Sequence, residues 1–557
     1  MTDTPDPRFP LLGVEERRRA LHFTSSAPRR FPAGAPLFAA GDRDSPAFLI
    51  LEGTVEVTVR GTDGGDATLV EHGPGSITGE VGQLAGHPAL ATGRAGPRGC
   101  LAAAFDADHL RALIVGSADI GEKVMHAFVS RRTTMIGRGT GATIVGSAHT
   151  PEVQRVQRFL SRNGYPHTLL DTENDTDAGE LVERLVTDDA LLPLVVCPNG
   201  TVLNGPTDAE IGIALGLTPT LDPTACHDVV IVGAGPAGLA TAVYAASEGL
   251  SVLIVDAHSF GGQAGASNRI ENYLGFPAGI TGQALTGRAF TQAQKFGAQI
   301  AIPIDVSHIQ CGGPSRDRTI PITLQTSTGI ALTTRAVVIA TGARYRRPPI
   351  HDLARYESTA VSYWASAIEA EECRGTTALL VGGGNSAGQA AVYLAPHLEQ
   401  LHVIIRGEGL HTSMSRYLVE RIADLPNVHV HTRSEVVALR GPIQGYFQAT
   451  VRHRSTDVLT EYGISRLFSF IGADPNTAWL SECAVAVDDH GFILTGAATS
   501  HANPVTSVDR RAPLETSVPG IFAVGDVRAG STKRVAAAVG DGAAVVAQLH
   551  AYYATNL

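Results

Sequence analysis

The sequence contains few cysteines, no long apolar run and no excess of positive charge. Its 557 residues include 6 cysteines, none of them spaced as Cys-x-x-Cys, so neither a zinc ribbon nor a disulfide-rich scaffold is indicated. No uninterrupted apolar run is long enough for a membrane span. The formal net charge of −11 disfavours nucleic acid and anionic membranes as partners, because both select basic patches. We therefore expect a cytoplasmic protein in a reducing compartment, with no nucleic-acid or membrane partner.

Glycine is abundant, at 61 residues, and the length suggests three or four domains. Residues 10–138 read as short strands broken by Gly and Asp turns, followed by a helix over 119–137. Residues 140–218 read as a strand, a turn, an amphipathic helix and a Pro-led hairpin. From Asp228, and again from Ala378, the chain runs as strand, Gly-rich turn, helix and strand. Two such units predict two doubly wound, Rossmann-like α/β domains.

The first Gly-rich turn carries a complete dinucleotide fingerprint. It reads Gly-x-Gly-x-x-Gly after an apolar strand and before an alanine-rich helix, and the next strand ends in an acid about 20 residues later. The glycines let the backbone approach a pyrophosphate, and the helix N-terminus supplies N–H donors. The predicted binding residues are Gly233, Gly235, Pro236, Ala237, Gly238 and Asp256.

The second Gly-rich turn is a variant of this fingerprint with alanine at the third position. The strand after it ends in Arg406 instead of an acid, and a guanidinium there suits the 2′-phosphate of NADPH. Arg416 is either a second phosphate ligand or a solvated helix charge, while Glu408 nearby opposes the preference for NADPH over NADH. The other predicted residues of this site are Gly382, Gly384, Asn385, Ser386 and Ala387.

Further motifs resemble the low-molecular-weight thioredoxin reductase family. They follow in the family's order at residues 261–263, 270–277, 340–343, 471–477 and 520–526. The resemblance implies FAD and NADPH as cofactors, and a homodimer formed through the flavin domains. It also implies a flavin domain in two segments, 227–344 and 466–557, interrupted by an NADPH domain over 345–465.

The same resemblance implies further FAD contacts outside the fingerprint. Asp526 would bind the ribityl chain, and the helix that begins at Arg534 would direct its N-terminus toward the isoalloxazine. The implied contacts are Gly262, Gln263, Asn272, Thr341, Gly342, Gly525, Asp526, Arg534 and Val535.

The redox-active cysteine pair of that family is missing. Trp364 and Ala367 stand where the resemblance places the two cysteines, and neither side chain can form a thiolate or a disulfide. Thioredoxin reduction by the usual dithiol relay is therefore in doubt. Trp364 either covers the flavin or fills core space between domains. Cys373 is either a redox-active thiol or a buried inert one.

Residues 10–138 resemble a cyclic-nucleotide-binding β-roll, with residues 79–91 as its phosphate cassette. Glu80 matches the ribose-binding acid of that family, but Ala89 stands where the phosphate-binding arginine belongs. We expect cyclic AMP to bind weakly or not at all, unless Arg94 turns inward as a substitute. The alternative is a β-roll that serves only packing or the binding of a partner.

Residues 140–218 resemble a thioredoxin or glutaredoxin fold, but the turn at 146–151 has no cysteines. Leu192-Pro193-Leu194 resembles the family's cis-proline segment, and Cys197 should be buried on the next strand. His149 is expected to start a helix, with no catalytic role, because no nucleophile accompanies it. The region is interpreted as a redox-silent docking or spacing module.

Together these features predict a multidomain flavoprotein oxidoreductase. Electrons would pass from NADPH through FAD to an unidentified small-molecule or protein acceptor. One alternative is a disulfide reductase that acts through a single cysteine or a partner. The other is a regulatory flavoprotein that senses a ligand or a redox state.

Overall fold

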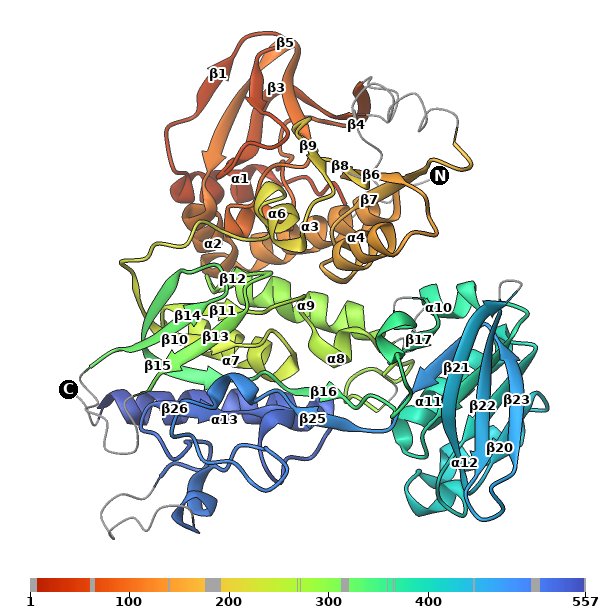
Figure 1. The fold of residues 1–557 in the computed structure, drawn as a ribbon. Coiled ribbons are helices and arrows are strands. Elements are labelled where there is room, and N and C mark those ends of the chain that lie inside the picture. Colours follow the sequence, from red (N-terminus) through yellow and green to blue (C-terminus); the bar gives the residue numbers. More distant parts are fainter. Residues whose placement is uncertain are drawn as a thin grey trace.

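The described residues form six sheets (Figure 1). A seven-stranded mixed sheet and a five-stranded parallel sheet are the centres of two α/β domains, and the N-terminal modules hold sheets of five and four strands. A three-stranded meander and a two-stranded connection complete the fold. In Figure 1 the two N-terminal modules, red to yellow, lie on one side of the first α/β domain, and the second α/β domain lies at its end. Among the described residues, no helix combines the length and the apolarity that crossing a bilayer requires. The computed structural model describes residues 8–60, 66–138, 141–175, 192–267, 269–270, 272–311, 320–357, 359–363, 365, 367–443, 446–501 and 511–554.

The N-terminal domain is an antiparallel β-roll followed by two helices. Its strands lie in the order β1-β5-β3-β4, with β2 paired to β5. The apolar faces of β3 and β5 enclose the interior, as expected for antiparallel strands with one buried face. The elements are α1 (Val14–Ala20), β1 (Arg29–Phe31), β2 (Pro36–Phe38), β3 (Ala47–Arg60), β4 (Asp66–His72), β5 (Thr92–Phe105), α2 (Ala107–Gly116) and α3 (Ala118–Arg138).

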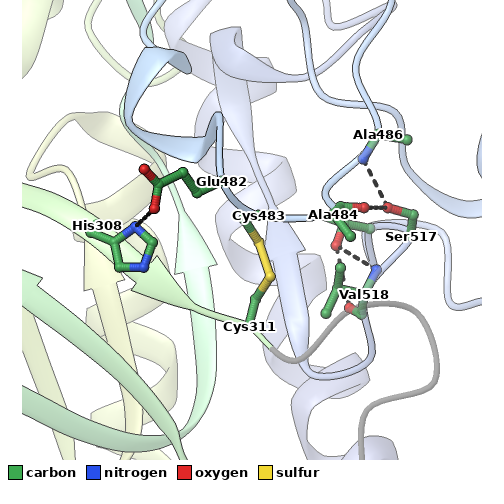
Figure 2. The surroundings of a disulfide bond; sticks show 9 residues. His308, Cys311, Glu482, Cys483, Ala484, Ala486, Ser517 and Val518 are labelled. Atoms are coloured by element: carbon green, nitrogen blue, oxygen red, sulfur yellow. Dashed lines mark hydrogen bonds and ion pairs between the residues drawn. A yellow bond between two sulfur atoms is a disulfide. The ribbon is translucent and has the colours of Figure 1, made fainter.

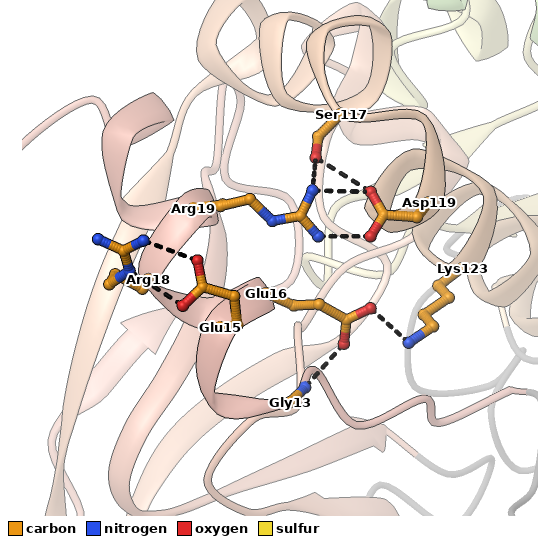
Figure 3. Close-up of polar contacts among 8 residues, drawn as sticks. All are labelled: Gly13, Glu15, Glu16, Arg18, Arg19, Ser117, Asp119 and Lys123. Atoms are coloured by element: carbon orange, nitrogen blue, oxygen red, sulfur yellow. Dashed lines mark hydrogen bonds and ion pairs between the residues drawn. The ribbon is translucent and has the colours of Figure 1, made fainter.

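Ion pairs on the surface fix α1 to the start of α3 (Figure 3). Arg19 pairs with Asp119, and Lys123 donates to Glu16 at 2.6 Å. Glu16 also accepts a 2.8 Å hydrogen bond from the backbone of Gly13, so it caps α1 at the same time. The Arg19 guanidinium lowers the pKa of Asp119 to about 2. Such exposed pairs orient a helix more than they stabilise a domain.

The second module is a four-stranded sheet in the order β7-β6-β8-β9, with β6 parallel to β7 and antiparallel to β8. Helix α4 begins at Pro151, and the side chain of Thr150 before it caps the helix by accepting a hydrogen bond from the backbone of Val153. The Leu192–Pro193 peptide bond is cis. The expected strand–turn–helix and Pro-led hairpin are confirmed, whereas the likeness to thioredoxin stays a prediction. The elements are β6 (Ala142–Gly146), α4 (Pro151–Arg162), β7 (His167–Asp171), β8 (Leu194–Val196), β9 (Val202–Asn204) and α6 (Asp208–Ala214).

The first α/β domain is built on a seven-stranded sheet, β12-β11-β10-β15-β14-β13, with β26 paired to β15. Strands β10, β11, β12, β15 and β26 are parallel, and β13 and β14 form an antiparallel hairpin. Helices α7, α9 and α13 cover one face. The elements are β10 (Cys226–Val232), α7 (Pro236–Ser247), β11 (Val252–Val255), α8 (Gly262–Gly265), α9 (Gly282–Lys295), β12 (Gln299–Ala301), β13 (Val306–Gln310), β14 (Ile322–Thr326), β15 (Ala331–Ile339), β26 (Ile521–Ala523) and α13 (Val535–Ala554).

The second α/β domain combines a five-stranded parallel sheet, β17-β24-β18-β19-β20, with the antiparallel meander β21-β22-β23. One apolar core lies between the parallel sheet and its helices, and another lies between that sheet and the meander. The elements are β17 (Val361–Ser362), α10 (Ala367–Glu372), β18 (Thr377–Val381), α11 (Asn385–Leu394), β19 (Gln400–Ile404), α12 (Arg416–Ala423), β20 (Val428–His431), β21 (Ser434–Ile443), β22 (Tyr446–His453), β23 (Leu459–Ile464) and β24 (Arg466–Ser469).

Strand β24 corrects one expected domain boundary. It pairs with β17 and β18 inside the second sheet, so residues 466–469 belong to this domain and the predicted start of the second flavin segment at 466 is one strand too early. The chain then returns to the first domain through β25 (Ala473–Pro475), which pairs with the outgoing β16 (Ala343–Tyr345). These two antiparallel passes connect the domains.

A disulfide joins Cys311, after β13, to Cys483 in the returning segment (Figure 2). The two Cα atoms are 5.9 Å apart, although 172 residues separate them in sequence. Beside the bond, His308 lies 3.4 Å from the carboxylate of Glu482. This pair was not predicted from the sequence, because no local spacing connects the two cysteines.

Candidate active site

The turn between β10 and α7 uses two of its glycines for packing and leaves space at the third. A Cβ on Gly233 would lie 2.4 Å from the carbonyl oxygen of Ala340, and one on Gly238 would lie 1.9 Å from that of Gly233. Gly235, the N-cap of α7, has no atom within 4 Å of its Cβ position. The open space therefore lies at a helix N-terminus, which is where fingerprint domains bind a pyrophosphate.

Asp256 follows β11 and holds this turn in place. Its carboxylate accepts backbone hydrogen bonds of 2.9 Å from Ala234, 2.9 Å from His258 and 3.0 Å from Ser259. The donors fix the orientation of the acid next to the fingerprint turn. Its predicted contact with a ribose fits this position and stays a prediction.

Segments from distant parts of the chain meet at the start of α7. A Cβ on Gly262 would lie 3.2 Å from the Cα of Gly235, and one on Gly525 would lie 2.9 Å from the Cβ of Ala237. Gln263 donates to the carbonyl of Ala343, which follows the 341–342 turn. The structure thus brings together the predicted residues Gly233, Gly235, Pro236, Ala237, Gly238, Asp256, Gly262, Gln263, Thr341, Gly342, Gly525 and Asp526.

Helix α13 is held against the same site. A Cβ on Gly542 would lie 2.4 Å from the carbonyl oxygen of Ala237, so α13 crosses α7 at close range. Arg534 and Val535 stand at its start. Burial raises the pKa of Asp526, a shift that Lys533 opposes. This acid therefore sits in a partly desolvated position near a helix N-terminus, where a hydrogen-bond donor such as a hydroxyl would stabilise it.

Asn272 is the exception among the predicted flavin contacts. It is exposed in the loop between α8 and α9, and no described contact joins it to the other site residues. Its neighbour Glu271 lies outside the described residues.

The second Gly-rich turn has the same construction. A Cβ on Gly382 would lie 2.4 Å from the carbonyl oxygen of Phe470, whereas Gly384, the N-cap of α11, has nothing within 4 Å. Ala387 is buried in the core, so the third position serves packing. Asn385 accepts a 2.6 Å hydrogen bond from the backbone of Ser415, the N-cap of α12. Two helix N-termini therefore lie side by side, with Ser386 in the first turn of α11.

The charged side chains near this turn differ in whether they already have an ion-pair partner. Arg406 is exposed and has no hydrogen-bond or ion-pair partner in the part of the chain that the structure describes. Glu408, which opposed the preference for NADPH, is paired with Arg433 at 2.6 Å. Arg416 pairs with Glu420 at 2.7 Å, and its side chain is 92% exposed. Of the two candidate phosphate ligands, only Arg406 is ready to bind an anion without losing an ion pair.

Of the two candidate catalytic residues, the structure describes only Cys373. Trp364 lies outside the described residues. Cys373 is 1% exposed in the core of the second α/β domain, and burial raises the pKa of its thiol. A buried thiol with a raised pKa is a poor nucleophile, because the thiolate is the reactive form. The geometry therefore gives no support to redox chemistry at Cys373.

The second N-terminal module reaches the first dinucleotide site, a contact that sequence reasoning missed. Arg162, at the end of α4, donates a 3.2 Å hydrogen bond to the carbonyl of Gly262. Next to it Asn163 donates to the carbonyl of His258 at 3.1 Å, and Gln283 donates to that of Ser161 at 2.6 Å. Burial lowers the pKa of Arg162, an effect that the charge of Asp256 opposes. No motif signals this contact, because its two partners belong to separate domains.

The polar residues predicted for the nucleotide cassette of the β-roll have partners within the protein. Glu80 pairs with Arg132 of α3 at 3.4 Å. Ala89 is buried, and Arg94 is exposed and donates to the carbonyl of Gly34 at 3.4 Å. The acid expected to bind a ribose thus has a partner already, and Arg94 has not turned inward.

Two Gly-rich turns on separate parallel sheets, each open at a helix N-terminus, define a flavoprotein oxidoreductase with two dinucleotide sites. The chain belongs to the pyridine nucleotide-disulphide oxidoreductase family, whose family model matches residues 227–542. A cyclic nucleotide-binding domain model matches residues 28–116, which confirms the class of the N-terminal domain. FAD and NADPH are the cofactors of thioredoxin reductases in this family.

Known proteins similar to this chain include several thioredoxin reductases. That of Treponema pallidum is 32% identical over 317 residues, or 57% of this chain and 94% of that protein. NADPH-dependent thioredoxin reductase 3 of Arabidopsis thaliana is 30% identical over 336 residues, and the match spans 59% of this chain and 59% of that protein, less than two thirds of its length. The structure of Lactococcus lactis thioredoxin reductase in its FR conformation matches with a TM-score of 0.51 and 27% identity, over 58% of this chain and 98% of that one.

Proposed function

We propose that this protein is an NADPH-dependent FAD oxidoreductase that passes electrons to an acceptor without a Cys-x-x-Cys relay. One observation carries the proposal: both dinucleotide turns keep their open glycine at a helix N-terminus, while Trp364 and Ala367 replace the relay cysteines. FAD and NADPH supply the redox chemistry when bound, and the protein supplies binding and orientation. The acceptor is a small molecule or a protein that reaches the flavin site.

The exposed guanidinium of Arg406 supports NADPH over NADH as the donor. It has no partner to give up in the described chain, and Glu408 is neutralised by Arg433. A charge-assisted hydrogen bond from arginine to a phosphate is among the strong ones in proteins. Arg416 would have to leave Glu420 to contribute.

The N-terminal modules are proposed to act as a docking unit on the flavin domain. The contact between Arg162 and Gly262 supports this role, because it ties the second module to a residue beside the fingerprint turn. By resemblance to thioredoxin reductases, we also propose a homodimer through the flavin domains. Light scattering at low micromolar protein tests the dimer, and a mass of only 58.2 kDa would count against it.

A disulfide substrate is the second candidate, because the similar proteins bear the name thioredoxin reductase. The anaerobic addition of NADPH to the purified protein, followed by flavin absorbance, tests the first half-reaction. A panel of acceptors, with thioredoxin included, then tests the second. Flavin bleaching followed by reoxidation with a non-thiol acceptor supports the proposal. Rapid thioredoxin reduction that a thiol-blocking reagent abolishes would favour the disulfide reductase, and a flavin that NADPH leaves oxidised contradicts both.

A further inference from the structure

A cavity of about 170 Å³ lies in the β-roll domain, bordered by strands of the roll and by α3. Its wall is largely apolar, with Phe38, Val57, Leu69 and Met135 among its residues. An apolar cavity of about 150 Å³ in another protein takes up a benzene ring. The space therefore suits an apolar group of about the size of one ring.

Three polar side chains in this wall, His72, Gln83 and Arg131, are buried. Gln83 is hydrogen-bonded to the backbone, whereas His72 and Arg131 each have a nitrogen without a hydrogen-bond partner among the described residues. Arg131 is 8% exposed, and its Nη1 donates to the carbonyls of Ile77 at 2.9 Å and Gly79 at 2.8 Å, but Nη2 has no partner. His72 is 3% exposed, and its Nδ1 has none. Buried polar groups in folded proteins are nearly always paired, so two unpaired ones beside one cavity indicate a missing partner.

The Arg131 guanidinium in the wall lies 5.2 Å from the ring centroid of Phe9 and 5.8 Å from that of Phe128, and it has no ion-pair partner among the described residues. Burial lowers the pKa of Arg131 to about 10, which leaves the guanidinium protonated at neutral pH. Burial, with the charge of Arg131, lowers the pKa of His72 to about 3, so its imidazole is neutral. Glu80, the acid in the wall, is paired with Arg132. No carboxylate of the described chain lies within ion-pair distance of Arg131, and a buried cation of this kind favours an anion beside it.

This charge is not placed for a cyclic nucleotide. Ala89, in the cavity wall, stands where the phosphate-binding arginine of the domain family belongs, and Arg94 points away to Gly34. The cation comes instead from Arg131 on α3. A purine, a sugar and a cyclic phosphate together are also several times larger than one ring.

We propose that this cavity binds a small carboxylate with an apolar body, paired through its carboxylate to Arg131. The body would contact Phe38 and Met135, and a carboxylate oxygen would lie within reach of His72. The cyclic nucleotide-binding domain would then respond to an organic acid in place of a nucleotide. The proposal does not depend on the electron acceptor.

Calorimetry on the full-length, FAD-loaded protein tests this proposal with benzoate and hexanoate as probes. We expect saturable binding of at least one of them, and binding of the neutral isostere benzamide at least tenfold weaker than that of benzoate. Cyclic AMP should not displace the bound acid. Failure of both acids to bind at millimolar concentration overturns the proposal, as does equal binding of benzamide.

Variants locate the binding in the cavity. Ala91→Leu would fill part of the space while leaving Arg131 intact, and should weaken benzoate binding at least tenfold. Arg131→Met should do the same, although it also removes the hydrogen bonds to the carbonyls of Arg8, Ile77 and Gly79. Arg94→Gln, on the exposed side of the same domain, is the matched control and should bind like the wild type. Unchanged binding by Ala91→Leu would place the acid elsewhere and contradict the proposal even if Arg131→Met fails to fold.

Discussion

Arg162, near the end of the second module, donates a hydrogen bond to the carbonyl of Gly262, a residue that borders the fingerprint turn of the first α/β domain. The Arg162 side chain is partly buried, and its contact joins the second module to the edge of the candidate FAD site. The second module is therefore a structural neighbour of that candidate site.

Arg162→Met should weaken FAD binding about tenfold. The lost bond involves a charged donor, and such bonds contribute about 1.5 kcal/mol or more, which corresponds to about a factor of ten in affinity. Flavin content after dialysis against FAD-free buffer measures the effect. Glu152→Gln, at the exposed start of the same helix, is the control. Equal flavin retention by all three proteins would show that the contact serves module docking alone.

Gly235→Trp should abolish FAD binding while the protein still folds. The position opens onto free space at the N-terminus of α7, so the indole would occupy the room of the pyrophosphate. Gly287→Trp, in α9 and equally open, controls for the bulk of the new side chain. The ratio of flavin to protein absorbance measures the outcome. A yellow Gly235→Trp protein with full FAD content would show that the first fingerprint is misassigned.

Arg406→Glu should erase the preference for NADPH by lowering kcat/KM for NADPH about tenfold to a hundredfold, because a charge-assisted pair is replaced by repulsion. The rate with NADH should change little. Arg440→Glu, exposed on β21, controls for the change in net charge. Flavin reduction by each nucleotide in a stopped-flow instrument gives both rates, and a wild type that uses NADH and NADPH equally would contradict the assignment.

The β-roll domain should lose stability as the pH falls below about 6.5. His72 is neutral in the folded domain, with its pKa lowered to about 3, whereas the unfolded chain takes up a proton near pH 6.5. Protonation thus favours the unfolded state between these values, at a cost of about 2 kcal/mol by pH 5.

Pulse proteolysis in urea at pH 7 and pH 5, followed by mass spectrometry of β-roll fragments, measures this dependence. His72→Phe should reduce the difference between the two pH values. His126→Phe, at an exposed position of α3, should leave it unchanged. If the wild type and His72→Phe lose equal stability on acidification, His72 does not carry the pH effect.

Local patterns predicted much of the site, and contacts between distant segments account for what they missed. The fingerprint at Gly233 and Gly235 is visible in sequence because strand, turn and helix are consecutive. Strand β24 was predicted in the wrong domain. The three strands of the meander separate it in sequence from its partners β17 and β18, so no local pattern shows that it pairs with them. The contact of Arg162 and the cavity around Arg131 follow from tertiary packing, which no spacing within one segment encodes.

The bond between Cys311 and Cys483 encloses the entire second α/β domain in a covalent ring. After Cys311 the chain forms β14 and β15 of the first domain, passes through the second domain and returns shortly before Cys483, so all of these elements lie in one closed loop. A protease cut anywhere inside that loop would leave the two flavin segments linked, and only reduction would release them. Closing so long a loop also removes many conformations from the unfolded chain. The two segments of the first α/β domain therefore stay parts of one molecule even when the second domain is cut.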